Sequence, residues 1–89
     1  MKKSVIYPGS FDPFTYGHMN IIERASGLFD EVIIAVAVNS SKNSILTINQ
    51  RVETIKKVFN RSKKIKVDKF EGLLVHYAKK KKVNTILRG

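Results

Sequence analysis

Short apolar runs recur along the chain and predict the strands of a sheet. Residues 32–38 are seven consecutive apolar residues, mostly β-branched, with no polar alternation. A strand covered on both faces has this pattern, so we expect the central strand of a parallel sheet here. The apolar run at residues 4–7 predicts a first strand. Residues 64–68 alternate, which predicts a strand nearer a sheet edge, and residues 83–87 predict a fourth strand.

In the segments between these strands, apolar residues recur at helical spacing. Residues 17–29 and 73–81 each place apolar side chains on one face, which predicts a first and a third helix. Thr47 and Gln50 have the spacing of a capping box and introduce a second helix, predicted over residues 48–60. The expected inner faces are Ile22, Ala25 and Phe29 in the first helix and Leu74, Tyr77 and Ala78 in the third.

Strictly alternating strands and helices with short links predict the fold class. Such an order is typical of an α/β domain with a parallel sheet and right-handed crossovers. We expect one domain over residues 1–89, an open parallel sheet with helices on both faces. In an open parallel sheet, ligands bind outside the carboxyl ends of the strands.

Charge is distributed unevenly along the chain. The formal net charge is +10 at pH 7. Residues 1–41 hold three basic and four acidic residues, a net of −1, whereas residues 42–89 hold fourteen basic and three acidic residues, a net of +11. This balance indicates an anionic partner such as a nucleotide, a nucleic acid or a membrane surface. The alternative interpretation of most of these lysines is a solvated, lysine-rich surface.

The composition excludes several classes of protein. The chain contains no cysteine, which excludes disulfides, thiolate metal sites and cysteine nucleophiles. This usage fits a cytoplasmic protein, which is the location we expect. No apolar run approaches the length of a membrane span, and the N-terminus has no signal-peptide pattern, so we expect no membrane association.

Chemistry-bearing residues follow each predicted strand and would gather at one edge of the sheet. Gly9 permits close approach of a ligand to the backbone, and the start of the first helix is a natural phosphate site. Together these groups suit a polyphosphate and a second phosphorylated substrate. The residues in question are Gly9, Ser10, Thr15 and His18 after the first strand, Ser40, Ser41 and Lys42 after the second, Gly72, Leu73 and Leu74 after the third, and Arg88 and Gly89 after the fourth.

Residues 7–18 read YPGSFDPFTYGH and carry a resemblance to a known family. Thr15-Tyr16-Gly17-His18 resembles the T/HxGH signature of the nucleotidyltransferase superfamily. The whole stretch is similar to the opening of the bacterial phosphopantetheine adenylyltransferases. The resemblance implies a Rossmann-like nucleotidyltransferase fold, truncated here after the fourth strand. It also implies a longer chain, so we expect the domain to be incomplete at its C-terminus and this part alone to be inactive.

The same resemblance implies an ATP site at the phosphate-binding turn. His18 matches the motif histidine that stabilises the transition state at the phosphates. Ser10 stands where the family usually has threonine, and it keeps the hydroxyl that bonds phosphate. Phe11 and Gly17 match further positions at the ATP, and Gly89 begins a later ATP-contacting turn.

The acceptor side is implied in the same way. Lys42 matches the lysine that holds and orients the acceptor phosphate, so the implied catalytic residues are His18, Lys42 and Ser10. Arg88 and Ser10 match further contacts to the acceptor, and Leu74 matches a contact to the pantetheine arm. Asp12, before Pro13, is interpreted as a turn residue rather than a metal ligand. No protein metal ligands are predicted.

The implied reaction is adenylyl transfer from ATP to 4′-phosphopantetheine, which gives dephospho-coenzyme A and pyrophosphate in coenzyme A biosynthesis. Mg²⁺ is expected with the ATP, and a homo-oligomer, a hexamer, is expected by the same resemblance. One alternative is a nucleotidyltransferase with another acceptor, such as nicotinamide mononucleotide, or a cytidylyltransferase. Those relatives usually carry a histidine where this chain has Thr15, and Ser41-Lys42 and residues 87–89 favour phosphopantetheine.

A second alternative is a non-catalytic basic fragment that binds nucleic acid. Such modules interleave aromatic and basic residues. Here the aromatic residues stand mostly in apolar or turn positions. We therefore do not expect nucleic acid as a partner.

Overall fold

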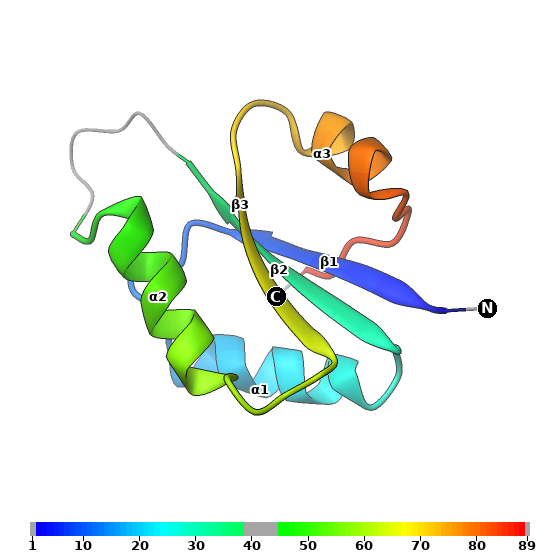
Figure 1. The fold of residues 1–89 in the computed structure, drawn as a ribbon, viewed down its shortest axis with the longest axis horizontal. Coiled ribbons are helices and arrows are strands. Elements are labelled where there is room, and N and C mark those ends of the chain that lie inside the picture. The colour runs from blue at the N-terminus through cyan, green and yellow to red at the C-terminus, as the bar shows by residue number, and fades with distance from the viewer. Residues whose placement is uncertain (1, 39–44, 89) are drawn as a thin grey trace.

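A computed structural model describes residues 2–38 and 45–88. Strands and helices alternate along it as predicted (Figure 1). No helix in these two ranges is long and apolar enough to cross a membrane. The elements are β1 (Ser4–Gly9), α1 (Tyr16–Ser26), β2 (Glu31–Ala37), α2 (Ile48–Val58), β3 (Ile65–Phe70) and α3 (Leu74–Lys81).

The sheet is parallel and has the order β1-β2-β3 within the described residues. Val32 of β2 pairs with Val5 of β1 on one side and with Ile65 of β3 on the other. The central position predicted for residues 32–38 and the edge position predicted for residues 64–68 are therefore both confirmed.

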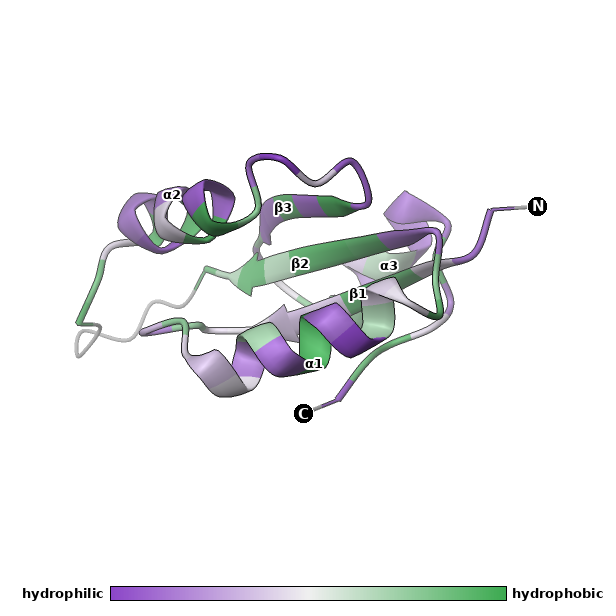
Figure 2. Cartoon of the chain, turned by 90° about the horizontal axis from the view of Figure 1, so that it is seen from below, coloured by the Kyte–Doolittle hydropathy of each residue, from purple (hydrophilic) through white to green (hydrophobic). Residues whose placement is uncertain are grey.

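Helices cover both faces of the sheet, with α1 and α2 on one side and α3 on the other (Figure 1). Alternate residues of β2 serve the two layers. Val32, Ile34 and Val36 pack towards α1 and α2, whereas Ile33 and Ala35 pack towards α3. Because both faces are covered, β2 is apolar at every position after Glu31, and Figure 2 shows it hydrophobic along most of its length. The α/β, Rossmann-like fold is confirmed.

The predicted fourth strand is wrong as an extended element. Residues 83–87 meet the free side of β1 at a single parallel bridge between Ile6 and Ile86. The amide of Ile6 donates to the Thr85 carbonyl at 3.0 Å, and the Leu87 amide donates to the Ile6 carbonyl at 2.8 Å. Val83 buries its side chain in the apolar cluster that also contains Ile6 of β1 and Tyr77 of α3. The segment nevertheless lies beside β1, where a fourth parallel strand would lie.

Several predicted boundaries also moved: β1 continues to Gly9 instead of residue 7, and α2 ends at Val58 instead of residue 60. Helix α1 ends at Ser26 instead of residue 29, because Gly27 caps it by donating to the Arg24 carbonyl at 3.2 Å. Strand β3 continues to Phe70, two residues beyond its predicted end at residue 68. Its carbonyl accepts from the Val38 amide at 2.8 Å, and its ring lies 5.1 Å from that of Tyr77. A local cap thus sets the end of α1, whereas contacts to neighbouring elements set the end of β3.

A polar contact fastens α3 to the edge strand. The Tyr77 hydroxyl donates to Oδ2 of Asp68 at 2.7 Å, and the Lys81 ammonium lies 3.3 Å from the same oxygen. Burial alone would raise the pKa of Asp68, but hydrogen bonds from Tyr77, the Lys69 amide and Lys81 lower it overall. Burial and then Asp68 raise the pKa of Tyr77, so its hydroxyl stays a donor.

We expect this contact to make stability depend on acid pH. The folded-state pKa of Asp68 lies below its ordinary value of 3.8, so the carboxylate contributes stability above that pH. The contribution is lost as pH falls through the folded-state pKa. Asp68→Asn should cost less than about 1 kcal/mol near neutral pH, because the pair is partly exposed. Urea unfolding at a series of pH values measures this; a difference from the parent that persists in acid would contradict it.

Candidate active site

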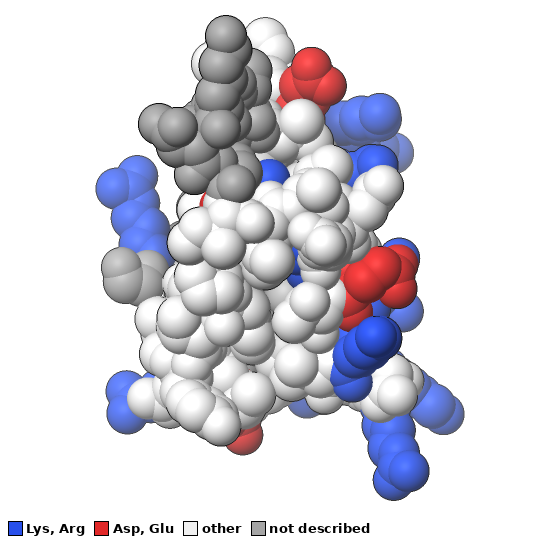
Figure 3. Space-filling view, turned by 90° about the vertical axis from the view of Figure 1, so that its left-hand side faces the viewer, with Lys and Arg blue, Asp and Glu red and all other residues white. Residues whose placement is uncertain are grey.

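A cavity of about 590 Å³ opens at the carboxyl end of β1. The chain passes from β1 to β2 and β3 on one side and returns beside β1 with residues 83–87 on the other. Ligands of open parallel sheets bind at such a change of direction. Figure 3 looks onto this end, where lysine and arginine stand mostly at the margin of a largely uncharged surface. The lining residues are Tyr7, Pro8, Gly9, Ser10, Phe11, Asp12, Pro13, Thr15, Gly17, His18 and Ile21.

His18 is held by the N-terminal cap of α1. The Thr15 hydroxyl accepts from the His18 amide at 3.4 Å, and Nδ1 of His18 accepts from the Thr15 amide at 2.9 Å. This is a capping box in which histidine takes the place usually held by Glu or Gln. Because a backbone N–H donates to Nδ1, the neutral ring carries its proton on Nε2. His18 therefore offers one hydrogen-bond donor at the positive end of a helix.

Aromatic rings fix the orientation of the imidazole. Phe14 stacks on it at 5.5 Å between centroids, Phe11 meets it edge-on at 4.9 Å, and Tyr7 lies 6.3 Å away. Burial among these side chains lowers the pKa of His18 below its ordinary value of 6.5. The ring is therefore neutral near pH 7, which preserves both the cap and the Nε2 donor.

Histidine NMR tests this protonation state directly. We expect His18 to titrate below pH 6.5 and its neutral form to show an unprotonated Nδ1. Since the unfolded chain binds the proton more readily, stability should fall as pH drops from 6.5 through the folded-state pKa. His76→Ala, on the exposed side of α3, leaves a single imidazole and assigns the signal. A neutral form protonated on Nδ1 would contradict the cap.

The turn after β1 is compact because its side chains interlock. Phe11 is 2% exposed and has φ of 48°, a left-handed conformation that only surrounding contacts sustain in a residue with a side chain. A Cβ at Gly9 would lie 3.0 Å from the Phe11 ring, so the buried ring would have to shift to accommodate a side chain there. Ser10 is exposed at the top of this turn.

Two further residues tie this turn to α2, and no sequence pattern singled out their contacts. The Asp12 carboxylate accepts from the amides of Ile45 and Leu46, both at 2.8 Å. Its interpretation as a turn residue is thus extended to a link across 33 and 34 positions of sequence. Arg51 is 3% exposed and donates to the Ser10 carbonyl at 2.8 Å. A lone arginine at a helix-inward position is the signal that would have found it.

The structure brings part of the predicted site together. Ser10, Phe11, Gly17 and His18 all line the cavity. Arg88 is exposed and follows the segment paired with β1, so it lies towards the same end of the sheet.

Other predicted site residues lie apart from these. Leu74 does not line the cavity; it is half-buried against the layer beneath α3 and borders a separate apolar cavity of about 370 Å³. Lys42 and Gly89 lie outside the described residues. The roles predicted for Leu74, Lys42, Arg88 and Gly89 stay predictions.

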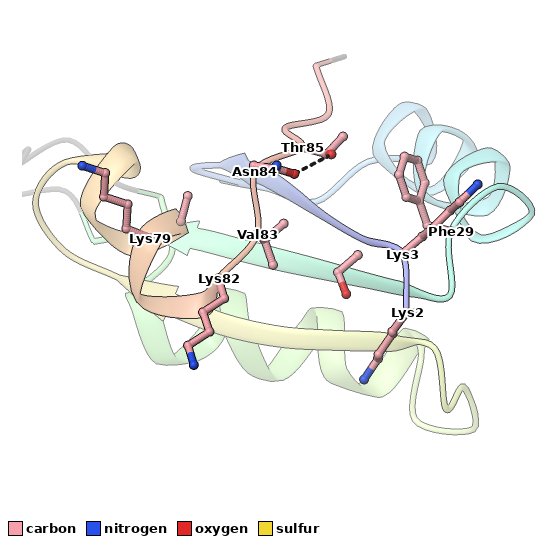
Figure 4. A pocket seen from close by; sticks show the side chains of 10 residues that line it. Lys2, Lys3, Phe29, Lys79, Lys82, Val83, Asn84 and Thr85 are labelled. Carbon is pink, nitrogen blue, oxygen red and sulfur yellow. Dashed lines mark hydrogen bonds between the residues drawn. The ribbon is translucent and has the colours of Figure 1, made fainter.

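A larger cavity, of about 730 Å³, lies at the opposite end of β1 (Figure 4). Four lysines border it, but Lys3 and Lys79 point to opposite sides of this view, and Lys2 is paired with Glu31 at 3.2 Å. Ammonium groups that diverge do not form an anion site. The cavity of about 590 Å³ at the carboxyl end of β1 has a helix N-terminus and a fixed imidazole, so we assign the chemistry there.

Comparisons with known proteins identify relatives of the chain. The phosphopantetheine adenylyltransferases of Leptospira biflexa and Syntrophus aciditrophicus are 58% and 47% identical to the chain over 89 residues. The matches cover all of this chain but only 56% and 54% of those proteins, so the chain spans about half the length of the relatives it matches. The resemblance of residues 7–18 is thereby confirmed over the whole chain.

A solved structure and a family model place the fold. The lipopolysaccharide core biosynthesis protein of Thermoplasma volcanium superposes with a TM-score of 0.75 at 22% identity, over 97% of this chain and 73% of that one. The cytidylyltransferase-like family model matches residues 6–89. The chain therefore belongs to the cytidylyltransferase-like family of the nucleotidyltransferase superfamily.

Proposed function

We propose that the protein transfers the adenylyl group of ATP to 4′-phosphopantetheine, a step of coenzyme A biosynthesis. The observation that carries this proposal is the fixed Nε2 donor of His18 beside the cavity at the carboxyl end of β1. The identity of 58% to a phosphopantetheine adenylyltransferase supports the choice of acceptor.

In this reaction an oxygen of the acceptor phosphate attacks the α-phosphorus of ATP. The bond from that phosphorus to the oxygen bridging to the β-phosphorus breaks, and pyrophosphate leaves. No bond to the protein is needed, so positioning and charge stabilisation supply the catalysis. His18 donates from Nε2 to phosphoryl oxygens as negative charge shifts, and the N-terminus of α1 adds its positive dipole.

The remaining predicted residues take roles on the acceptor. Lys42 and Arg88 would hold its phosphate, Ser10 would offer its hydroxyl, and Leu74 would contact the pantetheine arm. These placements rest on the resemblance alone.

Mg²⁺ would neutralise charge on the transferring phosphates. No group of three His, Asp or Glu side chains in residues 2–38 and 45–88 is placed to hold a metal ion. We propose that Mg²⁺ arrives on the nucleotide, bound by phosphate oxygens. A cytoplasmic location and a hexameric assembly complete the proposal, and size-exclusion chromatography with light scattering would test the latter.

Initial rates with a panel of substrates test the function. The longest natural form of the protein should use ATP with 4′-phosphopantetheine much faster than ATP with nicotinamide mononucleotide, or CTP with 4′-phosphopantetheine. Each nucleotide without an acceptor serves as the blank. A faster reaction with nicotinamide mononucleotide, or with CTP, would replace the proposal with the corresponding alternative.

A further inference from the structure

Arg51 is the one buried charged side chain among the described residues. Its partners are backbone carbonyls rather than a carboxylate: Ser10 at 2.8 Å, Thr47 at 3.4 Å and Ala37 at 3.5 Å. Burying a cation is costly, and an apolar residue of similar volume often stabilises a core as well or better. The contacts therefore indicate that Arg51 fixes the relative positions of the segments it joins rather than adding to the net stability of the fold.

Those carbonyls come from separate segments, and one of them, Ser10, lines the candidate active site. Ser10 belongs to the turn after β1, Ala37 ends β2, and Thr47 caps α2. The planar guanidinium, with donors in fixed directions, joins the turn to α2 in a defined geometry. A single shorter cation would not reach all of them at once.

Asp12 makes the complementary link from the other end of the turn. Oδ1 and Oδ2 each accept one backbone amide, from Leu46 and Ile45, just before the cap of α2. The turn is thus held at one end by Arg51 of α2, which donates to the Ser10 carbonyl, and at the other end by the Asp12 carboxylate, which accepts the two amides. Both links are within hydrogen-bonding distance and geometry.

Between the two links lies Phe11, whose left-handed φ of 48° persists only while its neighbours hold it. Its ring is buried and meets the His18 imidazole edge-on at 4.9 Å. A shift of the turn therefore moves the ring that supports the histidine. We propose that Arg51 and Asp12 are positioning residues, which hold residues 10–12 and, through Phe11, set the orientation of His18 for adenylyl transfer. The inference rests on the proposed function of His18.

Kinetics of conservative variants test it in the longest natural form of the protein. Arg51→Lys keeps the charge and loses the fork, and Asp12→Asn turns one acceptor into a donor that faces an amide. Each should lower kcat about 10- to 100-fold, because misplacement of a catalytic group acts on the transition state. KM for ATP should stay near that of the parent. The double variant should lose less than the product of the single losses, since both act on one turn.

Matched controls and a second measurement separate positioning from folding. Arg61→Lys and Glu53→Gln make the same chemical changes, arginine to lysine and carboxylate to amide, at exposed positions and should leave kcat unchanged. The NMR signal of the His18 ring, read without substrate and well below the melting temperature, should shift in Arg51→Lys and Asp12→Asn only. If Arg51→Lys does not fold, Asp12→Asn decides alone.

Unchanged kcat together with an unchanged His18 signal in both variants would overturn the positioning role. If the parent protein transfers no adenylyl group, the proposed function fails, but the His18 signal still decides whether Arg51 and Asp12 set the imidazole. A shifted signal then supports the positioning, and an unshifted one refutes it.

Discussion

His18→Ala should slow adenylyl transfer about 100- to 1000-fold, the usual cost of removing one donor aimed at developing charge. The imidazole is neutral near pH 7 because burial lowers its pKa, and its Nδ1 is taken by the Thr15 amide. The substitution therefore removes one donor at Nε2 and no net charge. Substrate binding rests on many other contacts, so kcat should fall more than KM rises.

The fold should survive this substitution. His18 is half-buried, and the Thr15 amide that it releases is exposed and finds water. Circular dichroism of the parent and the variant should coincide. His76→Ala, which removes an exposed histidine from α3, is the matched control and should keep full activity. Equal loss in both variants, or full activity in His18→Ala, would contradict the role given to His18.

Phe11→Ala should have the largest effect on stability, about 3–5 kcal/mol, which is typical for truncating a buried phenylalanine. Phe11 is 2% exposed and touches Tyr7, Phe14 and His18 within one aromatic cluster. Small domains have free energies of unfolding of about 5–15 kcal/mol. In a domain at the low end of this range, the loss would remove almost all of the stability. Denaturant unfolding measures it.

Tyr16→Ala is the matched control, because this aromatic residue is 87% exposed although it lies five positions away. It should change the free energy of unfolding by less than about 0.5 kcal/mol. A loss in Phe11→Ala no greater than that in Tyr16→Ala would show that the aromatic cluster does not organise the turn.

Much of the fold could be predicted because the local patterns are strong. The unbroken apolar run at residues 32–38 is typical of a strand covered on both faces. The structure places most of this run in β2, whose two faces are both buried. The capping box of Thr47 and Gln50 starts α2 at the expected residue. The prediction was wrong at residues 83–87, which form a single bridge to β1 instead of a full strand. The extent of strand pairing depends on the neighbouring strand, which a local pattern does not include.

The candidate site was only partly predictable. Thr15 and His18 have the same spacing as Thr47 and Gln50, yet only the structure showed that they form a reciprocal cap. The reason is that histidine is not the usual residue at the third helical position of a capping box. The helix-inward position of Arg51 is visible in the sequence, but the sequence does not show which groups its guanidinium contacts. Its contacts to Ser10 and Ala37 join residues far apart in sequence, which is a property of the assembled fold.

One measurement would decide first whether this site performs adenylyl transfer. The longest natural form of the protein, supplied with ATP, Mg²⁺ and 4′-phosphopantetheine, would be assayed for pyrophosphate and, by mass spectrometry, for dephospho-coenzyme A. We expect the two products in equal amounts, and neither when 4′-phosphopantetheine is left out. Pyrophosphate without dephospho-coenzyme A, or a folded protein that forms neither product, would contradict the proposed reaction.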